Sequence, residues 1–216
     1  MASKEYEAVL RLLLEAVQTV NDSRTKSTDE VPVGISNRHV HLSQADLDTL
    51  FGQGYKLTPI KDLSQPGQFA CKETVTIVGP KGAIEKVRVL GPVRGKSQIE
   101  ILAGDGVKLG IKGPAKLSGD LTGTPGITIV GPKGAVQTAE GVIVAQRHIH
   151  MTPRDAENYG VHDGQIVKIS VEGPRGGVYG NVVIRATDTS ALECHIDTEE
   201  ANAMGVDSST IVKIIK

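Results

Sequence analysis

The stretch "NRHVHLS" at residues 37–43 decides the fold, because a matching stretch, "QRHIHMT", returns at residues 146–152. In each stretch two histidines are separated by one residue, and both pairs recur at the same offset along the chain. The neighbouring residues match in kind as well. The sequence is therefore an internal duplication, which favours two related domains over one large domain.

Each histidine pair is followed by the start of a helix. Ser43 stands three residues before Asp46, and Thr152 stands three residues before Asp155. A hydroxyl followed at this spacing by a carboxylate satisfies the free N–H groups of a first helical turn. The pattern predicts a strand, a capping box and a short helix in each copy.

Two weaker copies of the same unit follow the histidine pairs. The segment "ECHIDTEEANAMGVDSSTIVKI" at 193–214 aligns with the segment that begins at the second pair and places His195 opposite His150. The segment "EILAGDGVKLGI" at 100–111 is a degenerate copy whose first residue is Glu100. Four related strand ends are therefore expected.

The composition predicts a mainly β protein. Only 3% of the 216 residues are aromatic, whereas 25 are glycine and 10 are proline, which suits short strands joined by tight turns. Segments 75–90, 127–145 and 166–186 each place strand-forming residues around a Gly-Pro-x-Gly turn. We expect each of them to form a hairpin.

The N-terminal region has a different pattern. Residues 4–20 carry apolar side chains at helical spacing, which predicts an amphipathic helix, and a polar linker follows. Two interpretations stay open. The helix packs on its own subunit, or it is a detachable peptide that docks on a partner.

Charge and cysteine content exclude several classes of function. The net charge is −1, so no global basic surface suggests nucleic acid or anionic lipid as a partner. Cys71 and Cys194 are too few for a disulfide framework, and the sequence has neither a signal peptide pattern nor a long apolar span. We expect a soluble cytoplasmic protein that does not bind a membrane.

The histidine pairs suggest metal chemistry. Residues i and i+2 of a strand project to the same side, so each His-x-His can direct two imidazoles at one point. A catalytic zinc ion takes three protein ligands and leaves one position open. The predicted ligand sets are His39, His41 and Glu100 for a first site, and His148, His150 and His195 for a second.

Residues outside the two ligand sets have weaker signals. Arg94 lies in a glycine-bearing segment six residues before Glu100, and its planar fork matches phosphate or carboxylate oxygens. His162 is expected in an exposed turn and Cys194 in the core. Cys71 has no base beside it in the sequence. The alternative to metal binding for a single His-x-His is two polar residues on the solvent-facing side of a strand.

The quoted motifs, together with "GPVRGKSQIEI" and "ECHID", resemble the phosphotransacylases of the PduL type, or phosphate propanoyltransferases, from about Val31 to the C-terminus. The resemblance implies a mainly β fold of two duplicated β-barrel domains capped by short helices, with the N-terminal amphipathic helix in addition. The expected division is an N-terminal helix and linker at 1–30 and domains at 31–125 and 126–216, between which strands can exchange.

The same resemblance implies a function. It is the reversible conversion of a short-chain acyl-CoA, propanoyl-CoA above all, and phosphate to acyl phosphate and CoA. It implies two zinc ions per chain on the six predicted ligands, with Arg94 binding phosphate. As a mechanism, the first zinc would stabilise the CoA thiolate, and the second zinc with Arg94 would orient phosphate.

The resemblance also bears on location and partners. Family members carry N-terminal extensions that direct them into bacterial microcompartments, where propanediol is degraded, so residues 4–20 are expected to contact shell or core proteins of such a compartment. A homo-oligomer and the acyl-chain length stay open.

Two other functions stay as alternatives. A cupin-like or other metal-dependent hydrolase would use Asp46 and Asp155, which follow the histidine pairs closely, as carboxylate ligands. A binding module would use the metals as structural supports, but structural zinc sites prefer four ligands and cysteine pairs.

Overall fold

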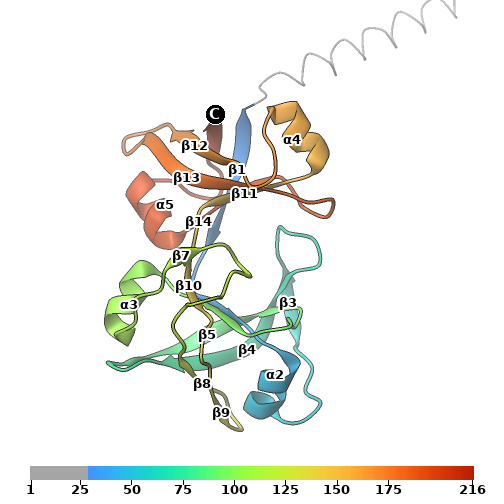
Figure 1. The fold of residues 1–216 in the computed structure, drawn as a ribbon, viewed down its shortest axis with the longest axis vertical. Helices are drawn as coiled ribbons and strands as arrows, with labels where there is room; N and C mark the ends of the chain where they lie inside the picture. Colours follow the sequence, from blue (N-terminus) through green and yellow to red (C-terminus); the bar gives the residue numbers. More distant parts are fainter. Residues whose placement is uncertain (1–28) are drawn as a thin grey trace, which may run out of the picture.

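The computed structural model describes residues 29–216, which form fifteen β-strands and four short helices (Figure 1). Six strands close into a barrel, and nine form a second, curled sheet, a half-barrel. The predicted mainly β fold of barrel-like sheets with short helices is confirmed. The helix expected at residues 4–20 lies outside the described residues.

The closed barrel has the strand order β1-β14-β11-β13-β12-β15. Strand β11, which carries the second histidine pair, pairs with β14 in antiparallel and with β13 in parallel orientation. The barrel strands are β1 (Glu30–Ser36), β11 (His148–Met151), β12 (Ile166–Val171), β13 (Gly177–Ala186), β14 (Glu193–Asp197) and β15 (Ile211–Ile215).

The nine-stranded sheet has the order β7-β10-β6-β2-β5-β4-β8-β9, with β3 paired to β4 beside this path. Its strand β2 pairs with β6 in antiparallel and with β5 in parallel orientation, as β11 does with its own neighbours. The strands are β2 (His39–His41), β3 (Pro59–Asp62), β4 (Phe69–Val78), β5 (Ala83–Gly91), β6 (Gln98–Glu100), β7 (Ala115–Lys116), β8 (Thr128–Val130), β9 (Ala135–Gln137) and β10 (Val142–Ala145).

The two sheets do not divide the chain at a single point. Strand β1 closes the barrel by pairing with β14 and β15 from the end of the chain. Strands β8 and β10 pair instead with β4 and β6 of the other sheet. The predicted domain limits at 31–125 and 126–216 stay a proposal about folding units.

The three expected hairpins are β4–β5, β8–β9 and β12–β13, each of them an antiparallel pair. The glycine and proline pattern thus located the turns of both sheets. The structural reason is that Pro sets the backbone angle of the first turn position and Gly closes the turn at low steric cost.

All four helices follow a strand of the repeated unit and begin at its end. The Thr152 cap is a full capping box, with Asp155 accepting a hydrogen bond from the Thr152 backbone N–H at 3.0 Å. The expected box at Ser43 is only half formed, because the Ser43 backbone N–H donates to Ser97 Oγ. The helices are α2 (Gln44–Phe51), α3 (Ala103–Leu109), α4 (Pro153–Tyr159) and α5 (Thr198–Met204).

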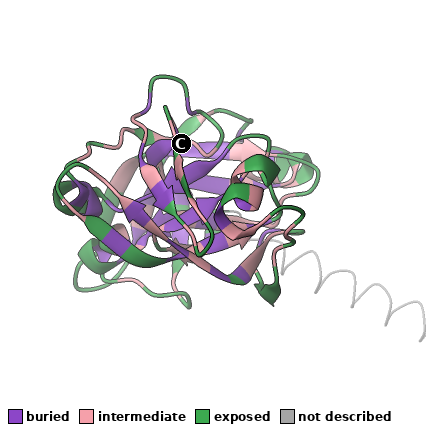
Figure 2. Cartoon of the chain, turned by 90° about the horizontal axis from the view of Figure 1, so that it is seen from below, coloured by how far each residue is buried: buried purple, intermediate pink, exposed green. Residues whose placement is uncertain are grey.

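Each sheet encloses its own apolar core, visible as buried strands inside an exposed rim in Figure 2. Ile149 and Met151 of β11 pack into the barrel core, and Val40 of β2 packs into the core of the other sheet. Each such buried side chain contributes roughly 1.5–3 kcal/mol. Because side chains alternate along a strand, the histidines of β2 and β11 point away from these cores.

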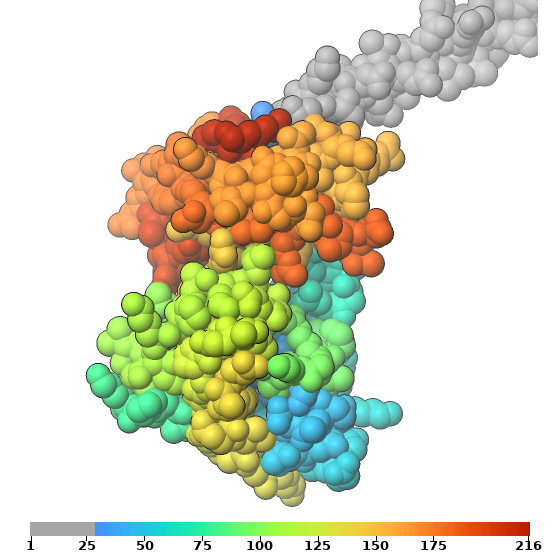
Figure 3. Space-filling view, viewed as in Figure 1, coloured from blue at the N-terminus to red at the C-terminus, as the bar shows by residue number. Residues whose placement is uncertain are grey.

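Figure 3 shows the two halves stacked, with the barrel above the nine-stranded sheet. Residues of both halves line one cavity of about 640 Å³. The histidine-bearing faces of β2 and β11 both contribute to its lining.

Candidate metal centre and anion pocket

Two groups of three donor side chains face this cavity. Within each group the donor atoms lie within 4.8 Å of one another. We call them the first cage, formed by His39, His41 and Glu100, and the second cage, formed by His148, His150 and His195. The structure brings the six predicted ligands together in the two expected sets.

Strand pairing supplies the third donor of each cage. His39 lies opposite Glu100 in the antiparallel pair β2/β6, and His148 lies opposite His195 in the pair β11/β14. In the alignment of the repeated segments His195 is the counterpart of His150, and the strand register adds that its partner across the pair is His148. Both histidines of β11 share one strand face, so the predicted set of three is unaffected.

The donor sets fit a metal ion such as zinc. His39 Nδ1 lies 2.8 Å from the carbonyl oxygen of Asn37, and His148 Nδ1 lies 2.8 Å from that of Gln146. A carbonyl only accepts, so each Nδ1 carries the proton and each Nε2 keeps its lone pair. This is the usual outer contact of a metal-ligating histidine.

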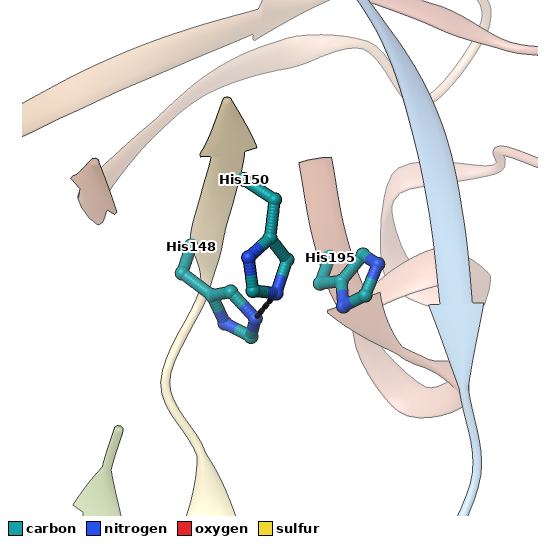
Figure 4. A group of neighbouring side chains, drawn as sticks. All are labelled: His148, His150 and His195. Carbon is teal, nitrogen blue, oxygen red and sulfur yellow. Dashed lines mark hydrogen bonds between the residues drawn. The ribbon is translucent and has the colours of Figure 1, made fainter. Parts of the chain in front are cut away.

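The spacing of the donors supports the same interpretation. His39 Nε2 lies 3.4 Å from Glu100 Oε2, and the Nε2 atoms of His148 and His150 lie 3.2 Å apart (Figure 4). Ligand atoms on a tetrahedral zinc ion lie about 3.3 Å apart, since the bonds are about 2.0–2.1 Å long. A cation between lone pairs would satisfy both contacts.

In the second cage, His148 and His150 are held in the neutral form. Burial, reinforced by the neighbouring His195, lowers the pKa of His148 to about 4. Burial and the charges of His148 and His195 lower the pKa of His150 to about 3. Neutral imidazole is the form that binds metal, so these two donors need no proton release at neutral pH.

The first cage combines opposite charges. Burial alone would lower the pKa of His39, but the facing Glu100 raises it above the ordinary value by charge and hydrogen bonding. Burial opposes the ionisation of Glu100, yet His39, His41 and Arg94 together hold its pKa far below the usual range. Burial lowers the pKa of His41 to about 3. This cage therefore carries a carboxylate charge.

A further residue accompanies the third donor of each cage, two positions before it. Gln98 Nε2 donates to Glu100 Oε1 at 2.6 Å, and Glu193 Oε2 lies 2.5 Å from His195 Nε2. With its Nε2 proton directed at Glu193, the His195 ring keeps a lone pair on Nδ1. Sequence reasoning overlooked the role of Gln98, although the shared i, i+2 spacing could have indicated it.

The loop between β3 and β4 joins the barrel beside the second cage. Ser64 Oγ donates to the carboxylate of Glu193. Gln65 donates to the carbonyl oxygen of Ala191 at 3.0 Å and accepts from its backbone N–H at 3.2 Å. These contacts connect the two halves at the rim of the cavity, and no sequence motif indicated them.

Arg94 lines the same cavity beside the first cage. Its backbone N–H donates to the carbonyl oxygen of Leu42 at 2.9 Å, and its Nη1 donates to Ser118 Oγ at 2.8 Å. The segment is thus fixed next to the helix start at Ser43, with which Arg94 forms a β-bridge. The remaining guanidinium donors are available for an anion.

The remaining candidates, Cys71, Cys194 and His162, do not line the cavity. Cys71 and Cys194 are fully buried free cysteines, and burial raises the pKa of their thiols to about 11 and about 12. Neither is a thiolate nucleophile at neutral pH. His162 is exposed in a turn, as expected. No helix within residues 29–216 has the length and apolarity needed to span a bilayer.

Comparison with known proteins identifies relatives over most of the chain. A family profile described as phosphate propanoyltransferase matches residues 32–207. A phosphate propanoyltransferase of Thermotoga maritima is 59% identical over 85% of this chain and 88% of its own length. Proteins of the same name from Rhodobacter capsulatus and Rhodopseudomonas palustris are 54% and 48% identical, over 95% and 100% of this chain and 96% and 99% of their own lengths.

Proposed function

The chain belongs to the phosphate propanoyltransferase family, a family of transferase enzymes, and we propose that it transfers the acyl group of a short-chain acyl-CoA to phosphate. Propanoyl-CoA is the proposed substrate, and the reaction is reversible. The observation that carries the proposal is one cavity lined by two three-donor cages and by Arg94.

The proposed cofactor is a pair of zinc ions. His39, His41 and Glu100 would hold one ion, and His148, His150 and His195 the other. When bound, the ions would supply Lewis-acid stabilisation of the leaving thiolate and neutralise the charge of phosphate. Three donors per cage fit this role, because catalytic zinc sites keep an open position for a substrate atom.

The chain's own residues would orient the reactants. The fork of Arg94 would bind phosphate oxygens. The Leu42 carbonyl fixes the Arg94 backbone, and Ser118 Oγ fixes the direction of the fork. A phosphate oxygen attacks the thioester carbonyl carbon, the C–O bond forms and the C–S bond breaks. The electron pair leaves on sulfur, and the proton of hydrogen phosphate ends on the CoA thiol.

The cavity volume suits this chemistry. Small-molecule sites usually enclose about 300–1,000 Å³, and about 640 Å³ lies between the two halves here. The site therefore has room for phosphate together with the acyl thioester end of CoA.

The hydrolase alternative is less well supported. A cupin-like site would use Asp46 and Asp155 as ligands. Asp46 Oδ2 instead accepts a hydrogen bond from Ser43 Oγ at 2.9 Å, and Asp155 Oδ2 accepts one from Thr152 Oγ1 at 2.7 Å. Both carboxylates thus serve helix starts, and neither belongs to a cage.

Location stays part of the proposal. We expect a cytoplasmic enzyme whose residues 4–20 bind a shell or core protein of a bacterial microcompartment. Deletion of residues 1–25 tests this expectation. Retained activity with lost co-sedimentation with shells supports targeting, whereas loss of folded protein supports a helix that packs on its own subunit.

One experiment tests the proposed reaction. CoA release from propanoyl-CoA is measured with and without phosphate, before and after removal of metal with a chelator. The expected result is release that requires phosphate, stops on chelation and returns with zinc. Turnover that survives complete metal removal contradicts the metal mechanism, and release that ignores phosphate favours a hydrolase.

A further inference from the structure

Ser118 presents a hydroxyl proton that finds no acceptor in the described part of the chain. Its Oγ accepts hydrogen bonds from Arg94 Nη1 and Gln98 Nε2, each at 2.8 Å. The Gln98 amide is oriented by the Gly119 backbone N–H, which donates to Gln98 Oε1 at 2.8 Å. Both groups that contact Ser118 are donors only, so they occupy the hydroxyl's lone pairs. Its proton must point elsewhere, and Ser118 lines the cavity.

Arg185 is a second donor in the same situation. It lies on β13, opposite His150 in the strand register, and its side chain lines the cavity while remaining half-buried. Among residues 29–216 it has neither a hydrogen-bond acceptor nor a carboxylate within ion-pair distance. The lining arginines Arg38, Arg88 and Arg94 all donate to protein oxygens.

Arg185 and Arg94 line the same cavity. Burial lowers the pKa of Arg94, the Glu100 carboxylate opposes this effect, and the charge of Arg185 adds to the lowering. Arg94 comes from the loop between β5 and β6, and Arg185 from the barrel. Two guanidinium cations facing one partly desolvated space repel each other unless an anion lies between them.

We propose that Arg185 and the Ser118 hydroxyl complete the phosphate site, so that phosphate is bound between two arginines contributed by opposite halves of the molecule. This inference rests on the proposed function and adds two residues to the single arginine assigned there. Hydrogen phosphate at neutral pH carries about two negative charges, as a phosphate monoester does, which match two guanidinium groups.

The location favours inorganic phosphate over the nucleotide phosphates of CoA. Arg185 pairs in register with a donor of the second cage, and Ser118 contacts the arginine beside the first. Both donors therefore lie at the reacting centre, whereas the nucleotide phosphates are a pantetheine arm away from the thioester. Because the donors come from both sheets, this site would exist only when the two halves are docked.

The test compares the kinetics of three variants with those of the wild-type, zinc-loaded enzyme. In Arg185→Ala the KM for phosphate should rise about tenfold to a hundredfold, the usual loss for a hydrogen bond to a charged group, while the KM for acyl-CoA stays unchanged. Arg185→Lys should be intermediate because it keeps the charge without the fork. Ser118→Ala should raise the KM for phosphate about threefold to tenfold.

A binding measurement separates affinity from catalysis. Calorimetric titration with inorganic phosphate should show weaker binding in the same order of variants, with metal content and far-UV circular dichroism unchanged. The matched controls are Arg154→Ala, which removes an exposed arginine outside the cavity, and Ser170→Ala on β12. Both should match the wild type. Arg94→Ala combined with Arg185→Ala should lose less than the product of the single effects, because both contact one anion.

The outcomes distinguish this inference from the proposed function. If wild-type CoA release does not depend on phosphate, the proposed function fails. If wild-type CoA release depends on phosphate, but Arg185→Ala and Ser118→Ala reach saturation at the same phosphate concentration as the wild type, only the present inference is overturned. A raised KM for acyl-CoA with normal phosphate binding also overturns it and assigns Arg185 to CoA.

Discussion

The two cages occupy equivalent places in the duplicated fold but differ in where their carboxylate lies. In the first cage the carboxylate is the third donor, Glu100, and its companion Gln98 is a neutral amide. In the second cage the third donor is His195, and its companion Glu193 carries the charge. The duplication thus fixes four positions and one carboxylate per cage, while the identity of the third donor can change.

This difference should give the two cages different roles. The first cage offers a charged oxygen donor, and its three residues are all buried. The second offers imidazoles alone, two of which are half-buried. We expect the first cage to be a charge-neutralising site, through the carboxylate of Glu100, and the second cage to be the more adaptable site.

The largest effect should follow the loss of one ligand from either cage. His41→Ala and His150→Ala remove equivalent donors, and each should lower activity at least about a thousandfold, because Lewis-acid stabilisation amounts to several kcal/mol. Mass spectrometry of metal content should show one ion lost per chain in each case. His162→Ala, in an exposed turn, is the control. Full activity in one of the two cage variants would show that only the other cage is catalytic.

Loss of Arg94 should have the next largest effect. Arg94→Ala removes a cation beside the first cage, and removal of one stabilising donor usually costs about a hundredfold to a thousandfold in rate. Metal content should remain normal, which separates this variant from the ligand variants. Rates measured over a range of phosphate concentrations should show weakened phosphate dependence. Unchanged phosphate saturation would refute the assigned role.

A smaller effect should appear when the companion residues are changed. Glu193→Gln removes the charge beside His195, and Gln98→Met removes the amide beside Glu100. Changes to such outer contacts usually weaken metal affinity about tenfold to a hundredfold. Competition titrations with a chelating dye should show the loss in the second cage for Glu193→Gln and in the first for Gln98→Met. Equal weakening of both cages by either variant would contradict independent cages.

The sequence predicted the ligand sets because their signal is local. A residue and its second neighbour share a strand face, so His39 with His41 and His148 with His150 could be paired without a structure. Copy matching located the strand ends that carry Glu100 and His195. It set Glu100 level with Glu193, whereas the strand registers make Glu100 the counterpart of His195. The half-formed cap at Ser43 could not be foreseen, because its competitor Ser97 comes from a distant loop.

The residues that the sequence did not indicate depend on contacts across the chain. Arg185 has no motif around it, and it enters the cavity only because β13 pairs with β11 in one register. Ser118 is assigned through two donors whose orientation depends on a third contact. Likewise, the bond between Ser64 and Glu193 joins residues from different sheets. Nonlocal pairing of this kind leaves no periodic trace in a single sequence.

The smallest effect should be on how the stability of the metal-free protein depends on pH. His41, His148 and His150 have pKa values of about 3 to 4 in the fold, below the ordinary value of about 6.5. The folded state therefore binds fewer protons than the unfolded state. Its stability should be complete above about pH 6.5 and should decline as pH falls toward 4 and below.

The comparison of cages predicts where this acid sensitivity resides. In the first cage the raised pKa of His39 opposes the effect of His41, whereas the second cage has two lowered histidines. In the presence of a chelator, the urea concentration at the unfolding midpoint should decrease as the pH is lowered from 7.5 to 5.0. His150→Gln should make that decrease smaller. His162→Gln should keep it. A urea midpoint that rises on acidification would mean that the histidines of the second cage do not make the metal-free fold sensitive to acid.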